Sequence, residues 1–342
     1  MNFLNNLQSV FIIAELSANH NGSKQIAMDS IKAAKRAGAD AIKLQTYTPD
    51  TITINSQKKD FQINNNTIWD GQTLYDLYYK AYTPWEWHLD LFNLAKKEGI
   101  LCFSTPFDKT AVDFLEELNN PIYKIASFEI TDIPLIEYIA KKNKPIIISS
   151  GIADYKDIKL AIKTIRKFND KQLALLKCTS SYPAPINEAN LKMIIDFKEK
   201  FNVVTGISDH TKGIIAPIVS TALGGKVIEK HFIIDKKIGG PDSTFSLDEK
   251  EFKLMVNSVR DTEKSLGKIN YNLTTKQKQG RYFARSLYAS ENIRFGEKFS
   301  EKNIKSIRPG FGLHPKFYNK LIGVKSKREI EKGDRLIESD LD

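Results

Sequence analysis

Eight short apolar runs rich in β-branched residues recur along the chain, separated by longer amphipathic stretches. The runs are FIIAEL (11–16), DAIKLQ (40–45), ILCFST (100–105), IYKIAS (122–127), PIIISS (145–150), LALLKC (173–178), VVTGIS (203–208) and KVIEKHF (226–232). Short apolar runs that alternate with helical patterns predict a parallel sheet buried on both faces. Eight such β/α units over about 250 residues predict an α/β fold of the (β/α)8 TIM-barrel type.

The intervening stretches support this prediction. Amphipathic patterns such as SKQIAMDSIKAAKRAG and PWEWHLDLFNLAKKEG end at Gly38 and Gly99, where glycine commonly terminates a helix. An open doubly wound sheet is the structural alternative, but no glycine-rich fingerprint follows the first strand. The interval 46–72 is polar, rich in asparagine and without helical periodicity, so it predicts a long loop over one mouth of the barrel.

The sequence changes character after the barrel. We expect a catalytic barrel over residues 1–264, a polar linker over 265–282 and a compact domain of short strands and turns over 283–342. A domain of about 60 residues is marginally stable alone and benefits from packing against a partner.

Composition excludes several classes of protein. The 51 Lys and Arg exceed the 41 Asp and Glu by 10, but no basic tail or lysine block marks a nucleic-acid or membrane partner. The two cysteines are too few for a disulfide framework or a metal finger. The N-terminus lacks a signal-peptide pattern, and no run approaches the roughly 20 apolar residues of a membrane span. We therefore expect a soluble, cytoplasmic protein.

Polar side chains gather where the predicted strands end. They are Glu15, Lys43, Gln45, Thr105, Lys124, Ser127, Glu129, Ser149, Ser180, Ser181, Ser208, Asp209, His210, Glu229, Lys230 and His231. Buried charges are costly unless they are paired, so a structural barrel would not concentrate them in this way. The carboxyl ends of barrel strands open onto one face, and that face holds the active site of such barrels.

His210 and His231 end neighbouring strands of the predicted barrel. Two imidazoles in this arrangement can share a divalent cation, with carboxylates or water completing its coordination. Ligands of this kind suit manganese or magnesium better than a closed zinc site. A pair of hydrogen-bonded core histidines, or one catalytic and one structural histidine, remains the alternative.

Lys43 and Lys124, with nearby hydroxyls, predict an anion site, although a Schiff base or ion pairs without a ligand are alternatives. Glu15 and Glu129 are candidates for acid–base catalysis, because a carboxyl group in a partly dry site can have its pKa raised towards neutrality. Asp242 lies in a GGPDS turn just beyond the last predicted strand.

Ten ordered motifs resemble the sialic acid synthase family. They are FIIAELSANHNGS, KLQTYTPD, STPF, YKIASFE, ISSG, CTSSYP, GISDHTKG, IEKHF, GGPDS and IRPGFG. The resemblance spans nearly the whole chain, and the last segment resembles the C-terminal antifreeze-like (SAF) domain of that family. AELSANH, KLQTYTPD and RPGFGLHPKFY are most similar to the branch of the family whose sugar is 2,4-diacetamido-2,4,6-trideoxy-L-altrose.

The resemblance implies a transferase that condenses phosphoenolpyruvate with the open-chain aldehyde of an N-acetylated amino sugar. The products are a nine-carbon 2-keto acid and phosphate, released by C–O cleavage. Carried over by motif, His210 and His231 would hold the metal, which is expected to be Mn2+, with Mg2+ or Co2+ as alternatives. Glu129 would handle protons near the forming bond, while Glu15 and Asp242 would orient the attacking water. Phosphoenolpyruvate would be bound by Lys43, Thr105, Lys124, Ser127, Ser149 and Ser208, and the sugar by Gln45 and Tyr182.

Ser180 and Arg308 differ from the other motif residues. Ser180 stands where sialic acid synthases have asparagine, and its shorter side chain reaches phosphoenolpyruvate only if water fills the gap. Arg308 matches the family arginine that enters the partner subunit's site, which implies a domain-swapped homodimer.

Other functions stay open on the sequence alone. The same chemistry could act on N-acetylmannosamine or on the bacillosamine-derived precursor of legionaminic acid, since pocket contacts decide the sugar. A sugar-binding barrel without catalysis is an alternative from another class, against which the complete set of Glu, Lys and His argues. Nucleic-acid binding has no aromatic–basic stripe to support it.

Overall fold

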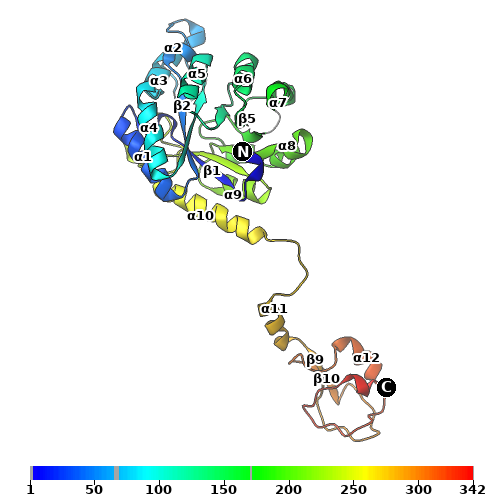
Figure 1. Cartoon of the computed structure of the whole chain (residues 1–342). Helices are drawn as coiled ribbons and strands as arrows, with labels where there is room; N and C mark the ends of the chain where they lie inside the picture. Colours follow the sequence, from blue (N-terminus) through cyan, green and yellow to red (C-terminus); the bar gives the residue numbers. More distant parts are fainter. Residues whose placement is uncertain (1–2, 65–68, 170–171, 342) are drawn as a thin grey trace. The chain divides into compact units, whose positions relative to one another are not determined.

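The computed structural model describes residues 3–64, 69–169 and 172–341. The chain divides into two compact units, Met1–Gly267 and Lys268–Asp342 (Figure 1). No helix of the described residues is both long enough and apolar enough to cross a bilayer.

Within the described residues of the first unit, eight parallel strands close into a barrel in sequence order. The strands are β1 (Phe11–Glu15), β2 (Ala41–Thr46), β3 (Leu101–Pro106), β4 (Tyr123–Ile125), β5 (Ile146–Ser149), β6 (Leu173–Cys178), β7 (Val204–Asp209) and β8 (Val227–His231). Pairing of β1 with β8 completes the cylinder, with Glu15 opposite His231. The predicted TIM barrel is confirmed, and every predicted strand lies within two residues of an observed one.

Helices surround this barrel (Figure 1). They are α1 (Lys24–Ala37), α2 (Pro49–Ile52), α3 (Leu74–Ala81), α4 (Trp85–Glu98), α5 (Lys109–Glu117), α6 (Ile133–Ala140), α7 (Tyr155–Phe168), α8 (Met193–Phe201), α9 (Ile215–Ala222) and α10 (Glu249–Leu266). Helices α1 and α4 end at Gly38 and Gly99, both in the left-handed conformation that L side chains rarely adopt.

The interval 46–72 is not the purely irregular loop that the sequence predicts. Helix α2 and a 3-10 turn at Lys59–Phe61 interrupt it. Pro49 opens α2, and Thr48 and Thr51 satisfy each other's backbone groups, so one short turn is stable without a visible periodicity. Residues 65–68 of this interval lie outside the described residues.

Side chains inside the barrel change from apolar to ionic along the strands. Near the amino ends, Phe11, Ile13, Phe103, Ile147 and Val227 form an apolar cluster. Alternation along each strand places the next inward-facing residues at the carboxyl ends, where they are polar. The barrel therefore has a dry base beneath a charged mouth.

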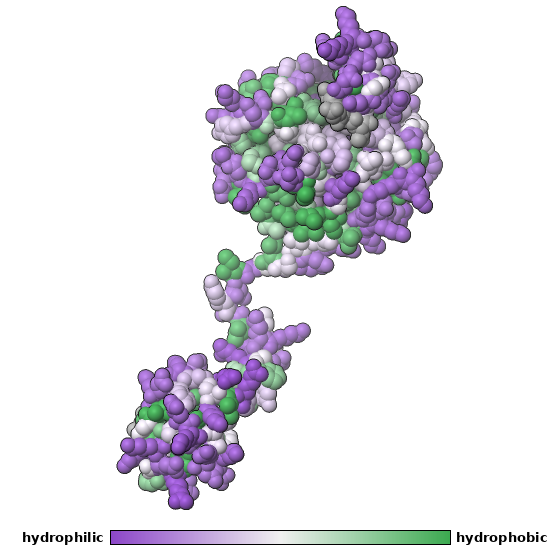
Figure 2. Space-filling view, turned by 180° about the vertical axis from the view of Figure 1, so that it is seen from behind, coloured by the Kyte–Doolittle hydropathy of each residue, from purple (hydrophilic) through white to green (hydrophobic). Residues whose placement is uncertain are grey.

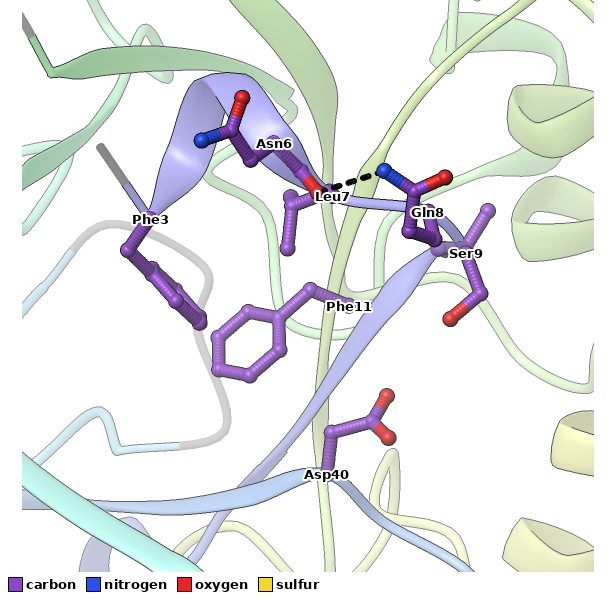
Figure 3. Close-up of a pocket in the computed structure, with 8 residues that line it drawn as sticks. Phe3, Asn6, Leu7, Gln8, Ser9, Phe11 and Asp40 are labelled. Carbon is purple, nitrogen blue, oxygen red and sulfur yellow. Dashed lines mark hydrogen bonds between the residues drawn. The ribbon is translucent and has the colours of Figure 1, made fainter. Parts of the chain in front are cut away.

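The amino-terminal segment closes the base. The rings of Phe3 and Phe11 meet edge to face with their centroids 5.1 Å apart (Figure 3). A cavity of about 450 Å³ lies beside them. Asp40 is the ionisable residue on its wall, and that carboxylate accepts hydrogen bonds from the Ile12 backbone and from Arg260. The carboxylate in this cavity is thus already paired.

The second unit contains a small sheet and its own core. Strands β9 (Ser286–Ala289) and β10 (Ile304–Ile307) pair antiparallel, and α12 spans Tyr318–Leu321. Their core includes Leu287, Phe299 and Leu336. Helix α11 (Thr275–Gly280) lies within the interval predicted as a linker.

The surface of each unit is mostly hydrophilic, with apolar residues gathered in patches (Figure 2). In the second unit, the exposed apolar residues include Tyr282, Phe283 and Phe311, each more than half exposed. Tyr282 contacts both other rings, at centroid distances of 5.0 and 5.4 Å.

Candidate active site

Two lysines and two glutamates meet inside the barrel at its charged mouth. Lys43 Nζ lies 2.7 Å from Glu15 Oε2 and 3.8 Å from Glu229 Oε2. Lys124 Nζ lies 3.7 Å from Glu229 Oε1. All four side chains are buried. Glu229 on β8 therefore bridges the lysines of β2 and β4, and we call these four residues the charged cluster.

The charges of this cluster do not balance. Burial raises the pKa of Glu15 to about 7, although Lys43 opposes the shift. Burial also favours protonation of Glu229, but Lys124 and Lys43 outweigh it and hold the pKa of that carboxyl below its usual value. Near neutral pH the two lysines, of which Lys124 has its pKa lowered by burial, therefore face one carboxylate held ionised and a second, Glu15, that is only partly ionised. An excess of positive charge in a dry site suits an anionic ligand.

Hydroxyl groups from three further strands contact the charged cluster. The contacts are Lys43 Nζ to Thr105 Oγ1 (3.0 Å), Lys124 Nζ to Ser149 Oγ (2.8 Å) and Ser208 Oγ to Glu229 Oε1 (3.0 Å). Strands β3, β5 and β7 thus add one hydroxyl each to groups that β1, β2, β4 and β8 supply. Barrel closure brings together side chains that are far apart in the sequence.

Ser127 and Ser180 form a second polar pair, with their hydroxyl oxygens 2.7 Å apart. Gly151 lies directly behind it, because a Cβ at this position would be 2.1 Å from Ser180 Oγ and 2.2 Å from Ser127 Cβ. Any larger residue would displace the two hydroxyls. The short side chain of Ser180 thus reaches a hydrogen-bond partner in Ser127.

His210 and His231 face each other, with their ring centroids 5.2 Å apart. The rings of Tyr182 and Phe245 pack against both. His210 Nδ1 lies 3.1 Å from the Thr179 carbonyl oxygen, so an Nδ1–H donating there leaves Nε2 free. Strand β8 and the residue following β7 thus place two imidazoles side by side in an aromatic enclosure.

The surroundings of the two imidazoles show whether they fit a divalent cation. Among the described residues, no three His, Cys, Asp or Glu side chains are arranged to hold a metal. His231 Nδ1 is buried without a hydrogen bond, 3.6 Å from Asp242 Oδ2. Burial holds the pKa of His231 well below its usual value, so the ring stays neutral with a lone pair available. The pair therefore fits a cation whose other ligands are substrate and water.

Glu129 lies in the turn after β4, and its Oε2 atom is buried without a hydrogen-bond partner. Burial raises the pKa of Glu129 to about 7, and Asp132 adds to the shift while Lys124 and Lys43 oppose it. A carboxyl group with this pKa can hold or release a proton near neutrality.

The raised pKa predicts a pH-dependent gain in stability for Glu129→Gln. A carboxyl whose folded pKa exceeds its unfolded value stabilises the fold fully below about pH 4.5 and loses that contribution as pH rises towards 7. Glutamine escapes this loss, so the variant should gain about 1–3 kcal/mol over the wild type at pH 8 and almost nothing at pH 4. Denaturant unfolding at both pH values measures the difference. An equal change at both would contradict the raised pKa.

A cavity of about 300 Å³ opens beside these groups. Its polar wall includes Gln45, Ser127, Glu129, His231 and Asp242. The charged cluster does not line this cavity, but it is linked to it, since Gln45 Nε2 donates to Glu15 Oε1 at 2.9 Å. The barrel mouth therefore combines an open cavity with a buried cationic site beneath its wall.

The whole arrangement can bind an anion, hold a cation and move protons within one barrel mouth. Comparisons with known proteins identify the family of the chain. Residues 30–271 match the NeuB family, and residues 284–342 match the SAF domain. The chain belongs to the NeuB family. Its fused SAF domain explains the short strands and turns of the second unit.

Individual relatives place the chain more closely. It is 54% identical to pseudaminic acid synthase of Campylobacter jejuni strain 81-176, over 97% of each chain. The pseudaminic acid synthase of Helicobacter pylori is 46% identical, over 98% of this chain and 99% of that one. The crystal structure of the N-acetylneuraminic acid synthetase of Leptospira borgpetersenii, in complex with citrate, superposes with a TM-score of 0.71 at 32% identity. That match covers 80% of this chain and 90% of that chain.

The structure assigns contacts that sequence reasoning did not. Glu229 is the bridge of the charged cluster, and Gly151 makes room for the serine pair. Cys178 Sγ lies 3.8 Å from His210 Nδ1, so this buried thiol is part of the site's surroundings. The signals were the alternation of IEKHF, which puts Glu229 on the same face as His231, and the glycine of ISSG. Arg308 belongs to the second unit, where it is exposed.

Proposed function

We propose that this chain is a pseudaminic acid synthase, a transferase that condenses phosphoenolpyruvate with 2,4-diacetamido-2,4,6-trideoxy-L-altrose. The supporting observation is the 54% identity, over 97% of each chain, to a relative with that name. The site supplies the chemistry this reaction needs: a cationic pocket for phosphoenolpyruvate, two imidazoles for a divalent ion and carboxyl groups with raised pKa values.

Phosphoenolpyruvate binds in the proposed mechanism at the charged cluster. Its negative charges compete with Glu15 and Glu229 for the ammonium groups of Lys43 and Lys124, whose pairing leaves an excess of positive charge. Hydroxyl groups donate hydrogen bonds to the remaining oxygens of phosphoenolpyruvate. They belong to Thr105, Ser127, Ser149, Ser180 and Ser208.

Carbon–carbon bond formation takes place next to the histidine pair. A divalent cation, most suitably Mn2+, held by His210 and His231 would polarise the aldehyde oxygen of the sugar. C3 of the enol attacks the aldehyde carbon, and the enol electrons leave C2 electron-poor. Gln45 and Tyr182 hold the sugar in the cavity, and Glu129 supplies or accepts the proton near the new bond.

Water then completes the reaction at C2. Glu15 and Asp242 orient the attacking water, and burial raises the pKa of both carboxyl groups so that each can accept a proton. The tetrahedral carbon expels phosphate by C–O cleavage, leaving the 2-keto acid. The oxygen of the water becomes the 2-keto oxygen, and its two protons end on the former aldehyde oxygen and on phosphate.

The homodimer is part of the same proposal. Arg308 closely precedes Gly310, whose backbone N–H donates to the Tyr282 carbonyl oxygen at 3.0 Å. Tyr282 and its neighbouring rings are the exposed aromatic residues of this unit. Exposed aromatic rings beside an arginine are typical of interface residues. We propose that this part of the SAF domain contacts the barrel mouth of a second copy.

A sugar screen tests the proposed function. The purified protein is incubated with phosphoenolpyruvate, Mn2+ and one of three sugars: the L-altrose derivative, N-acetylmannosamine or the bacillosamine-derived precursor of legionaminic acid. Phosphate release should be fastest with the first, should stop with EDTA and should return with added Mn2+. Preference for N-acetylmannosamine would move the chain to N-acetylneuraminate synthesis. If none of the three sugars supports phosphate release, the proposed function is overturned. Unchanged release in EDTA would overturn the metal role.

A further inference from the structure

The residues that line the 300 Å³ cavity are of two chemical kinds. The polar ones include the proposed catalytic groups. Six of the apolar and aromatic ones we call the apolar wall: Tyr47, Ile52, Leu77, Tyr78, Ala81 and Phe107. Apolar lining of this kind suits the apolar groups of a ligand.

Five of the six residues of the apolar wall lie outside the barrel strands, between β2 and α4, and the sixth, Phe107, directly follows β3. Ile52 ends α2, while Leu77 and Ala81 lie on α3, so they belong to the long connection between β2 and α4. Tyr47 joins the segments, because its ring meets those of Tyr78 and Phe107 at centroid distances of 5.7 and 5.1 Å. These edge-to-face contacts fix the wall in place.

The wall is not simply an extension of the core. Ile52, Ala81 and Phe107 remain partly exposed while lining the cavity, so their apolar surface faces the space where a ligand sits. Apolar surface left in contact with water is unfavourable, and a ligand that covers it with its own apolar groups gains affinity. The ligand should therefore carry methyl groups as well as polar groups.

We propose that the apolar wall selects the sugar by receiving its methyl groups. This inference rests on the proposed function. The 2,4-diacetamido-2,4,6-trideoxy sugar has two acetyl methyls and a C6 methyl, whereas N-acetylmannosamine has one acetyl methyl and hydroxyls elsewhere. Those hydroxyls would lose hydrogen bonds to water against Ile52, Leu77 and Ala81 without gaining partners. The wall therefore favours one sugar and disfavours the other.

Ile52→Asn tests the wall, with Ile54→Asn as the matched control. Ile54 lies two residues further along the same segment, is 67% exposed and does not line the cavity. In Ile52→Asn, kcat/KM for the diacetamido sugar should fall at least about 10-fold relative to kcat/KM for N-acetylmannosamine, because one methyl-sized contact in an apolar pocket is worth that much discrimination. KM for phosphoenolpyruvate should stay the same, and Ile54→Asn should leave the ratio unchanged.

Ala81→Ser provides a second, gentler variant in case Ile52→Asn does not fold. It adds one hydroxyl to the wall and should shift the sugar ratio in the same direction. An unchanged ratio in the folded variants would overturn the role of the wall. The wild-type enzyme separates this inference from the proposed function. If it does not use the diacetamido sugar at all, the proposed function fails. If it does, but the ratio of kcat/KM for the two sugars does not change in the variants, only the role of the apolar wall is overturned.

Discussion

Lys124→Met will lower kcat/KM for phosphoenolpyruvate by about 1,000-fold while the protein stays folded. Lys124 is 1% exposed and lies 3.7 Å from Glu229 in the charged cluster. Truncating the protein's partner in a buried charge pair with an anionic ligand costs about 2–5 kcal/mol of binding, and each 1.4 kcal/mol is a factor of ten. Steady-state kinetics with varied phosphoenolpyruvate measures the loss, which should include a raised KM for this substrate.

Stability should change little, because burial already lowers the pKa of Lys124 and thus disfavours its charge in the folded protein. Methionine fills most of the same volume, and Lys43 remains as a partner for Glu229. Lys141→Met is the matched control, since that lysine is half exposed on the barrel exterior and pairs with Glu137, which is also exposed. A Lys124→Met enzyme with wild-type KM for phosphoenolpyruvate would place the anion elsewhere.

The barrel could be predicted from sequence because its signal is local. A run of apolar residues indicates each strand, and Gly38 and Gly99 mark helix ends because glycine readily adopts the left-handed conformation found there. The positions of Lys43 and Lys124 within their strands, and of His231 at the end of β8, followed from the same local pattern. A parallel barrel then forces these ends onto one face without any further information.

The pairing of the charged groups could not be predicted in this way. Glu229 bridges Lys43 and Lys124 because closure of the barrel staggers the strands, which sets the inward residues of β2, β4 and β8 at one height. No local pattern contains that stagger. The apolar wall was missed for a related reason, since α2 is a single turn too short to show helical periodicity.

The alternation that points Glu229 and His231 inward also turns Lys230 outward, between the barrel and its helices. Lys230 and Asp209 are opposite each other on β8 and β7, and their charged atoms lie 2.5 Å apart with neither side chain exposed. Lys230 Nζ also donates to the Thr211 carbonyl, and Asp209 accepts from the Thr211 backbone N–H at 2.9 Å. This pair thus ties together the backbone that carries both His210 and His231.

Lys230→Met will therefore destabilise the barrel unit by about 3–5 kcal/mol, because Asp209 is left as an uncompensated buried charge. For a unit of this size, each kcal/mol shifts Tm by about 2–4 °C, so calorimetry should show a fall of roughly 10 °C. Lys236→Met is the matched control: that lysine pairs with Glu251 at 2.6 Å, but both side chains are about 40% exposed. A surface pair contributes at most about 1 kcal/mol. Equal shifts in Tm for the two variants would show that the Lys230–Asp209 pair has no special role in holding the histidines' strands together.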